Sequence, residues 1–502
     1  MTVPPAASGS GEPAPASAPS PASAPSPAST PAASAGPTAD RGPAGASEPG
    51  GPVRLALLGT GNRGGVYARW CARHPDRARV VAVADPDTLR RERLADAHGI
   101  PPGHRHDDWR DLLAAPPDCD AVVIATPDRE HVEPAEVALA AGYDVLLEKP
   151  IAPDEAGVRR VRAAARASSG EVTVAHVLRH TPFFAGVRRL LDDGAVGDVV
   201  DIEHAEHIGY WHFAHSYVRG NWRRAEASSP LILAKACHDL DLLRWFAGAG
   251  CASVASSGGL AHFHAGSAPD GAPRFCLDGC PVEATCPFHA GRIYLDALDA
   301  TPGWPVSVVS PEPGRDALEA ALRDGPYGRC VYRCDNDVAD HQQTLLAFDN
   351  GVTATLSVSA FTAQVTRKLR IRGTAGELAG DLRGGVLVLR RFVPGREQLA
   401  EVERWRLTPD DEAPSAADDR AAAHADEAST AQRGSPLASP GHGGGDEGLM
   451  AAFVARLHER CAGSGAAGKA PTGLEEAVDS HLMAFAAERA RHGGAVVAFS
   501  GS

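Results

Sequence analysis

Short apolar runs alternate with helix-like stretches between residues 53 and 175, and this alternation restricts the possible folds more than any other feature. Continuous apolar strands that alternate with helices are typical of a parallel sheet covered by helices on both faces. The sequence therefore predicts an α/β domain over residues 53–175. Its strand-like runs are Val53–Leu58, Val80–Ala84, Ala121–Ala125, Val145–Leu147 and Val172–Val177, and its clearest helical stretches are Val132–Ala141 and Glu155–Ala167.

A glycine-rich turn, Gly59-Thr60-Gly61-Asn62-Arg63-Gly64, follows the first run. Gly59 allows a tight turn, Gly61 lets a pyrophosphate approach the backbone, and Gly64 allows close packing of the next helix. The phosphates would lie on the free N–H groups at the start of that helix. The turn therefore predicts a Rossmann domain that binds NAD(P), with contacts from Gly59, Gly61, Asn62, Arg63 and Gly64.

An acid closes the second strand-like run, as Asp85 in Val-Ala-Asp-Pro-Asp. Its carboxylate is placed to accept hydrogen bonds from the adenosine ribose hydroxyls. It would repel a 2′-phosphate, and no arginine follows it directly. We therefore expect NAD as the cofactor, with NADP as the alternative.

The pattern changes after residue 176. Strand-like stretches dominate, and Asp349-Asn350-Gly351 is a strong hairpin signal between two of them. We expect an α/β domain with a large, open, mostly antiparallel sheet over residues 176–407. The predicted strands are Val199–His207, Leu345–Phe348, Val352–Ala360, Lys368–Gly373 and Val386–Arg391, and the predicted helices are Phe183–Leu191 and His238–Phe246.

Two stretches of low complexity, residues 1–52 and 408–445, are rich in Pro, Ala, Ser and Gly. Such sequences bury too little apolar surface to offset the entropy of ordering, so we expect both to be disordered. Helical periodicity resumes at Leu449–Cys461 and Leu474–Arg491. We therefore expect residues 446–502 to complete the fold with C-terminal helices.

The chain carries 49 Lys and Arg against 63 Asp and Glu, a formal net charge of −14. This balance argues against a nucleic-acid or anionic-membrane binder, which would present a basic face. No apolar run is long enough to span a bilayer. The first residues lack the charged start and apolar core of a secretory signal, so we expect a cytoplasmic protein without nucleic-acid or membrane partners.

Two further segments lie where ligands bind in open α/β sheets, at the carboxyl ends of strands. These are Thr126–His131 (TPDREH) and Glu148-Lys149-Pro150. Together with GTGNRG, VADPD, FAGVRRLLDDGAVGDVVDIE and CHDLDLLRWFAG, they make the chain resemble the Gfo/Idh/MocA oxidoreductases. That family includes glucose–fructose oxidoreductases and inositol dehydrogenases. The resemblance covers residues 53–502 apart from the 408–445 stretch.

The resemblance implies an NAD(P)-dependent oxidoreductase that acts on CH–OH groups. It would transfer a hydride between the cofactor and a sugar, cyclitol or related polyol. Lys149 would hold the substrate hydroxyl and relay its proton, and His238 would be the general base. The nicotinamide end would be lined by Thr126, Pro127, His131 and Glu148. A homodimer or homotetramer is expected.

One position departs from the family pattern. Dehydrogenases of this family often carry an acid four residues before the histidine, where this chain has Ala234. Lys235 is expected to take over part of the substrate binding or proton traffic. Asp241, three residues after His238, would contact the substrate, orient His238 or serve packing alone.

The segment from His212 to Arg223 is dense in hydrogen-bond donors and aromatic rings. Polyhydroxylated ligands need fixed polar groups beside a stacking ring, so His215, Arg219 and Trp222 are candidate substrate contacts. The alternative is a polar loop, anchored by its tryptophan, that only closes the domain.

Five cysteines gather in two short stretches, at Cys276, Cys280 and Cys286 and at Cys330 and Cys334. Four of them, or three with His289, could form a zinc site. However, the spacing is not that of paired CxxC motifs, and the family generally works without metal. We expect no metal and favour buried free thiols, with zinc and a disulfide as alternatives. The stretch from Cys330 to Asp337 could also reach the substrate pocket.

Two other functions are compatible with these motifs. Some relatives retain NAD, oxidise a sugar transiently and cleave a glycoside by elimination, without net redox change. A regulator that binds the dinucleotide without catalysis is the other alternative. Lys149 and His238 argue against the regulator, whereas Ala234 keeps both alternatives open.

Overall fold

The computed structural model describes residues 51–116, 118–296, 303–310, 312, 314–394, 400–407, 443–461 and 472–499. The two low-complexity stretches lie outside this part, apart from residues 51–52 and 443–445. Within the described ranges, no helix combines the length and the apolar character needed to cross a membrane.

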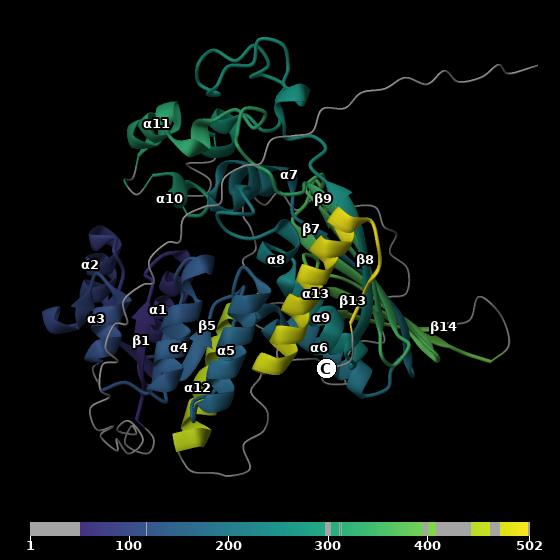
Figure 1. Cartoon of the computed structure of the whole chain (residues 1–502). Coiled ribbons are helices and arrows are strands. Elements are labelled where there is room, and N and C mark those ends of the chain that lie inside the picture. Colours follow the sequence, from purple (N-terminus) through teal and green to yellow (C-terminus); the bar gives the residue numbers. More distant parts are fainter. Residues whose placement is uncertain are drawn as a thin grey trace, which may run out of the picture. The chain divides into compact units, whose positions relative to one another are not determined.

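The first sheet has six parallel strands in the order β3-β2-β1-β4-β5-β6. Figure 1 labels two of them, β1 and β5. The strand order reverses between β1 and β4, which is where such sheets open a ligand crevice at the carboxyl ends. The predicted Rossmann sheet is therefore confirmed. The strands are β1 Val53–Leu58, β2 Ala78–Ala84, β3 Arg105–His106, β4 Ala121–Ile124, β5 Asp144–Leu147 and β6 Val172–Val174.

The strand predicted at Val172–Val177 is shorter than expected. The neighbouring strand β5 ends at Leu147, whose carbonyl accepts the last ladder bond from the Ala175 N–H at 2.8 Å. Beyond this bond none of the described strands pairs with the segment, and a 3-10 turn follows at Val177–His180 (η3).

Helices cover both faces of this sheet, and alternate strand residues feed two separate apolar cores. One core includes side chains of α3, α4, α5 and α13, and the other includes side chains of α1, α2 and α12. The helices are α1 Asn62–Arg73, α2 Thr88–Ala97, α3 Trp109–Ala114, α4 Val132–Ala140, α5 Glu155–Ala167, α12 Gly445–Cys461 and α13 Leu474–Gly493.

The C-terminal helices return to elements formed much earlier in the chain. Helix α12 packs against α1, β1 and η3, and α13 packs against α5, α9 and β8 (Figure 1). Both helices lie where the apolar periodicity predicts them. The last helix therefore contacts both the Rossmann helices and the second sheet.

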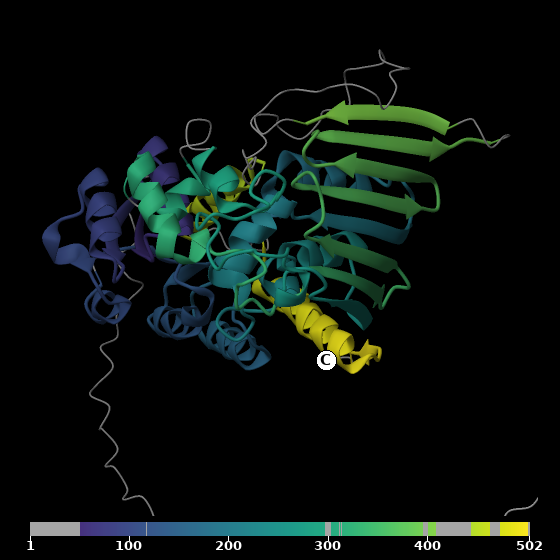
Figure 2. The ribbon, with the colours of Figure 1, turned by 90° about the horizontal axis from the view of Figure 1, so that it is seen from above.

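The second sheet has nine strands in the order β14-β13-β12-β11-β7-β10-β9-β8-β15 (Figure 2). Only the β7–β10 pair is parallel, which confirms the mostly antiparallel sheet. The predicted hairpin turn joins β9 to β10, with Gly351 at φ +88°. The strands are β7 Val199–His207, β8 Cys251–Gly259, β9 His341–Phe348, β10 Thr353–Ser359, β11 Thr366–Gly373, β12 Gly376–Asp381, β13 Val386–Phe392, β14 Ala400–Arg406 and β15 Val497–Ala498.

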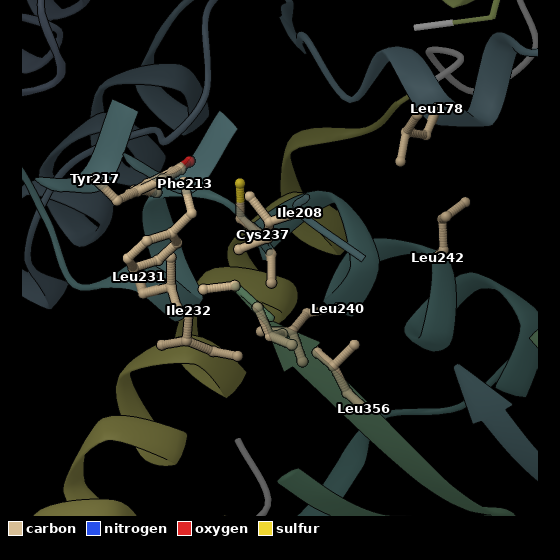
Figure 3. Packing of buried hydrophobic residues seen from close by; sticks show 14 of the residues in the cluster. Leu178, Ile208, Phe213, Tyr217, Leu231, Ile232, Cys237, Leu240, Leu242 and Leu356 are labelled. Atoms are coloured by element: carbon tan, nitrogen blue, oxygen red, sulfur yellow. The ribbon is translucent and has the colours of Figure 1, made fainter. Parts of the chain in front are cut away.

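Helices α6, α9 and α13 pack against this sheet. Figure 3 shows part of the resulting core, where Leu240 of α9 lies beside Leu356 of β10. The helices are α6 Pro182–Asp192, α7 Tyr210–Phe213, α8 Leu231–Ala234, α9 Cys237–Ala247, α10 Val306–Val309 and α11 Arg315–Asp324. The 3-10 segments are η1 Pro102–His104, η2 Asp128–Glu130, η5 Asn221–Arg223, η6 Ala265–Ser267 and η8 Pro326–Gly328, and the π-helical segments are η4 Ala214–Arg219 and η7 Gly291–Leu295.

Candidate active site

The glycine turn joins β1 to α1 with little room for side chains. Gly59 has φ +89°, and a Cβ there would lie 2.5 Å from the Ala125 carbonyl oxygen. A Cβ on Gly64 would lie 1.9 Å from the Gly59 oxygen. By contrast, no described atom lies within 4 Å of a Cβ placed on Gly61, so the space beside its backbone is open. A pyrophosphate fits such a bare backbone at a helix N-terminus.

Asp85 follows β2 and braces the glycine turn. Its Oδ2 accepts hydrogen bonds from the Thr60 N–H at 2.7 Å and the Thr60 hydroxyl at 2.9 Å. Its Oδ1 accepts one from the Asp87 N–H at 2.8 Å. The carboxylate is thus fixed, with lone pairs left to accept from a ribose. Arg91, which the sequence analysis did not consider, donates to the Asp85 carbonyl at 2.8 Å.

The side chain of Arg63 is engaged by two carboxylates. Its Nε donates to Glu148 Oε1, and its Nη2 donates to Asp446 Oδ1 of α12 at 2.7 Å. Tyr67 of α1 also donates to Glu148. Burial opposes ionisation of Glu148, yet Arg63 and Lys149 outweigh it and lower the pKa of this carboxyl. Arg63 therefore ties the glycine turn to the Glu-Lys-Pro segment.

His131 joins the loops that follow β4 and β5. Its Nε2 lies 2.9 Å from the Thr126 carbonyl oxygen, and its Nδ1 lies 2.6 Å from the Pro150 carbonyl oxygen. The Thr126 hydroxyl donates to the Glu130 carbonyl at 3.0 Å. Pro127 precedes the short turn η2. These bonds join the loop that contains Thr126 and Pro127 to the Glu148-Lys149-Pro150 segment through the buried His131.

Lys149 follows β5 and reaches the second domain. Its Nζ donates to the Ala234 carbonyl at 3.0 Å, at the end of α8. This is the position where many family members carry an acid. His238 lies four residues later, in the first turn of α9. The structure therefore brings Lys149 to the segment that carries His238.

Two buried histidines that the sequence analysis missed lie near this segment: His176 adjoins His238, and His481 adjoins His176. The ring of His176 lies 5.5 Å from the ring of His238 and 5.8 Å from that of His481. Burial, with Arg179 and Lys149, holds the pKa of His176 well below its usual value. His481 accepts from the Ile151 N–H at 2.9 Å, and its Nδ1 lies 2.6 Å from the Ala477 carbonyl oxygen.

Asp241 is engaged in a buried ion pair. Its two carboxylate oxygens each accept a hydrogen bond from Arg179, at 2.7 Å. Arg179 also pairs with Glu476 of α13. The side chain of Asp241 is 1% exposed. The ion pair of Asp241 with Arg179 joins α9 to η3, and Arg179 extends this link to α13 through Glu476.

Lys235 belongs to a second buried charge cluster. Its Nζ lies 3.3 Å from Glu206 Oε1 on β7, and Arg367 lies 2.8 Å from Glu206 Oε2. Arg367 also donates to Asp239, which His204 contacts at 2.7 Å. Burial lowers the pKa of Lys235, although Glu206 opposes this. Glu206 is thus a charged neighbour of the site that the sequence analysis missed.

The three candidates from the 212–223 segment lie in different surroundings. His215 Nδ1 lies 2.9 Å from the Tyr294 hydroxyl, and burial lowers the pKa of His215 to about 3. Buried Arg219 donates to the carbonyls of Arg329 and Phe288, both at 2.7 Å. Only Trp222 contacts the Rossmann loop, through Asp128 Oδ2 at 3.2 Å.

All ten cysteines are free thiols. Among the described residues, no group of three or more His, Cys, Asp or Glu side chains is arranged to hold a metal ion. Arg219 Nη2 lies 3.6 Å from Cys276 Sγ, and the Cys334 thiol donates to the Cys330 carbonyl at 3.4 Å. The cysteine stretches therefore pack around a buried arginine.

The chain has a Rossmann domain with an open glycine turn, and Lys149 joins this domain to the domain of the antiparallel sheet. These features define a dinucleotide-binding protein built of two α/β domains. Two family models match it. One, described as "Oxidoreductase family, NAD-binding Rossmann fold", matches residues 53–176. The other, "Oxidoreductase family, C-terminal alpha/beta domain", matches residues 188–403. The chain belongs to the Gfo/Idh/MocA oxidoreductase family, as its motifs predict, and carries that family's NAD-binding domain.

Curated proteins and solved structures resemble the chain to different extents. YteT of Bacillus subtilis is 26% identical over 271 residues, covering 52% of this chain and 60% of YteT. Inositol 2-dehydrogenase 4 of Saccharopolyspora erythraea is 34% identical over 202 residues, covering 39% of this chain and 54% of that protein. The matches thus span little more than half of these relatives. The structure of a levoglucosan dehydrogenase with NADH and levoglucosan shares the fold, with a TM-score of 0.61, 16% identity and 89% and 99% coverage of the two chains.

Proposed function

We propose that this protein is an NAD-dependent oxidoreductase that transfers a hydride between the nicotinamide and a CH–OH group of a sugar, cyclitol or related polyol. One observation carries the proposal. Lys149 leaves the carboxyl end of β5 and donates to the carbonyl at position 234, four residues before His238. The dinucleotide turn of the same sheet is thereby linked to a segment bearing a titratable base.

The residues of the first domain fit a dinucleotide. The open backbone at Gly61 and the N-terminus of α1 would hold the pyrophosphate, and Asp85 would accept from the ribose hydroxyls. A 2′-phosphate would lie against this carboxylate, which favours NAD over NADP. When bound, the nicotinamide supplies the hydride acceptor or donor.

Lys149 would bind the substrate hydroxyl. One N–H of its ammonium goes to the Ala234 carbonyl, and the other two can donate to the oxygen that gains negative charge as its proton leaves. Glu148, ionised and held by Arg63 and Tyr67, stabilises this positive charge from the adjacent position. His238 would accept the hydroxyl proton, since an imidazole titrates near neutral pH.

Lys235 would take the place of the missing acid. It lies next to Ala234, and its ammonium is held by Glu206. We assign it to substrate hydroxyl binding, because its Nζ lies 3.3 Å from Glu206 and its remaining N–H groups can donate to a hydroxyl oxygen. Trp222 would border the substrate, because it alone of the three candidates in its segment contacts the loop after β4.

The substrate class is supported by the names of relatives. An inositol 2-dehydrogenase matches part of the sequence, and a levoglucosan dehydrogenase shares the fold. Both names refer to polyhydroxylated rings. The hydrogen-bond donors of Lys149 and Lys235 suit such a ligand, because adjacent hydroxyls can each accept a bond.

We also propose a homodimer or homotetramer that uses the outer face of the second sheet. Three apolar side chains on this face are strongly exposed: Leu345 at 52%, Phe392 at 62% and Val402 at 55%. They lie on β9, β13 and β14, and alternate residues of β9 and β13 are buried on the opposite face, among them Leu346, Leu387 and Leu389. Exposed apolar side chains on one sheet face are typical of a surface that another copy covers.

Purified protein, incubated with NAD and a panel of sugars, cyclitols and aryl glycosides, tests the proposed activity. We expect NADH absorbance at 340 nm with a free polyol. Glycoside cleavage without net NADH would instead indicate transient oxidation. Dinucleotide binding with no turnover on any member would contradict an enzymatic role. Size-exclusion chromatography with light scattering tests the oligomer, and a monomer at micromolar concentration would contradict it.

A further inference from the structure

A hollow of about 690 Å³ lies in the second domain, apart from Lys149 and the glycine turn, and arginines dominate its wall. The chain as a whole is acidic, with a formal net charge of −14. Three guanidinium groups in one hollow therefore form a local positive charge in a chain whose net charge is negative. The lining residues are Ala272, Arg274, Arg329, Arg333, Cys334 and Asp335.

The one acid that lines the hollow, Asp335, does not neutralise the positive charge of its three arginines. Asp335 is shared between Arg329, at 2.9 Å, and Arg223, whose Nε also lies at 2.9 Å. The hydrogen bond from Arg223 contributes most to lowering the pKa of Asp335. Arg274 and Arg333 are exposed and form no ion pair with any residue that the structure describes. Their donors are therefore available to a ligand.

The backbone holds these arginines on a fixed frame. The Cys276 N–H donates to the Gly328 carbonyl and the Cys330 N–H donates to the Arg274 carbonyl, both at 2.9 Å. The buried Arg219 also donates to the Arg329 carbonyl, at 2.7 Å. The Arg333 N–H closes a turn onto the Cys330 carbonyl at 2.9 Å. A fixed frame lowers the entropy cost of binding a ligand.

We propose that this hollow binds the phosphate or carboxylate group of a small anionic molecule. Guanidinium groups present paired N–H donors that match the oxygens of both groups, and Arg is favoured where such recognition matters. The volume lies within the range of small-molecule sites. The cysteine stretches, which hold no metal-binding arrangement among the described residues, would serve as the frame of this site.

The hollow adjoins the segment that borders the candidate active site. Arg223, which pairs with its wall, directly follows Trp222, and Trp222 donates to Asp128 in the loop after β4. The anion could therefore be a remote group of the substrate itself or a separate small molecule. Only the first source rests on the proposed function.

Isothermal titration of the full-length protein, saturated with NAD so that the glycine turn is occupied, tests the site. The probes are inorganic phosphate and malonate at an ionic strength held constant with NaCl. We expect saturable binding of at least one probe. The double variant Arg274→Ser/Arg333→Ser should weaken it by roughly tenfold to a hundredfold, since it removes one or two charge-assisted contacts and each is worth about one tenfold step. Arg274→Lys/Arg333→Lys should retain part of it.

The matched control is Arg159→Ser/Arg323→Ser, which removes two exposed arginines outside the hollow, 64% and 63% exposed. It should bind like the wild type, and circular dichroism should show all variants folded. Absence of saturable binding of both probes, or equal binding by the Arg274→Ser/Arg333→Ser variant, would overturn the proposal. Because calorimetry needs no turnover, this result is independent of whether the protein proves to be a dehydrogenase.

Kinetics then separate the two sources. If the probe raises the KM of an active polyol acid or polyol phosphate without changing kcat, the hollow binds the substrate's own anionic group. If the probe binds without changing KM, the hollow binds a separate anion. Both results support an anion site and differ only in what carries the anion.

Discussion

Replacing Lys149 with alanine tests the role of the residue that joins the two domains. In the structure its Nζ gives one N–H to the Ala234 carbonyl, which leaves two donors for the substrate oxygen. Loss of one preorganised donor to developing negative charge lowers kcat by about 10²–10³. Loss of a proton-transfer group accounts for up to roughly 10⁴. We therefore expect kcat to fall by about 10²–10⁴, or ~3–5 kcal/mol in transition-state stabilisation.

The assay is initial-rate NADH formation, with NAD affinity measured separately by calorimetry. NAD binding should be nearly unchanged, because Arg63 still pairs with Glu148 and the glycine turn is untouched. Lys149→Arg should also be slow, since a planar guanidinium does not replace the compact ammonium. Arg159→Ala is the control, because this basic residue is 64% exposed on α5. Wild-type turnover in Lys149→Ala, or loss of turnover caused only by loss of NAD binding, would refute the assignment.

Three further predictions concern the cofactor, a buried ion pair and a buried histidine. Asp85→Ala should weaken the discrimination of NAD against NADP, measured as the ratio of their kcat/KM values; an unchanged ratio would remove Asp85 from the ribose site. Asp241→Asn should lower the free energy of unfolding by about 1–3 kcal/mol, since it removes the buried carboxylate that accepts two hydrogen bonds from Arg179 and leaves Glu476 as the remaining carboxylate partner of Arg179; urea denaturation measures this, and a normal midpoint with a raised KM would instead make Asp241 a substrate contact. Burial lowers the pKa of His481 to about 3, so its neutral form contributes stability that is present above pH 6.5 and is lost as the pH falls toward 3. The free energy of unfolding should therefore fall by about 2 kcal/mol from this residue between pH 7 and pH 5, and His481→Gln should flatten that slope; an equal slope in both proteins would contradict it.

Much of the fold could be predicted because its strands carry clear periodicity. β1, β7 and the helix α5 have the predicted bounds, and the Asp-Asn-Gly turn joins its two strands as expected. Strand β8 was not predicted, because Cys251–Gly259 is rich in Ser, Gly and Ala, which have low strand propensity. Its pairing with β9 and its packing against α13 form it, and neither is local in sequence.

The candidate site divides in the same way. Lys149 could be predicted, because its short motif follows a strand whose end is fixed by the fold. His176 and His481 could not, because more than 300 residues separate them and only the packing of α13 brings them together. Arg219 lies in a donor-rich segment that resembles a ligand-binding loop, yet it donates to the backbone carbonyls of Arg329 and Phe288.

The most direct test of the account follows the hydrogen itself. The protein is incubated with NAD and a polyol deuterated at its carbinol carbons, and the NADH formed is examined by mass spectrometry. The account predicts that the reduced cofactor gains one deuterium from the substrate and that Lys149→Ala forms it far more slowly. Reduced cofactor without deuterium, or no reduced cofactor with any polyol that binds, would contradict hydride transfer at this site.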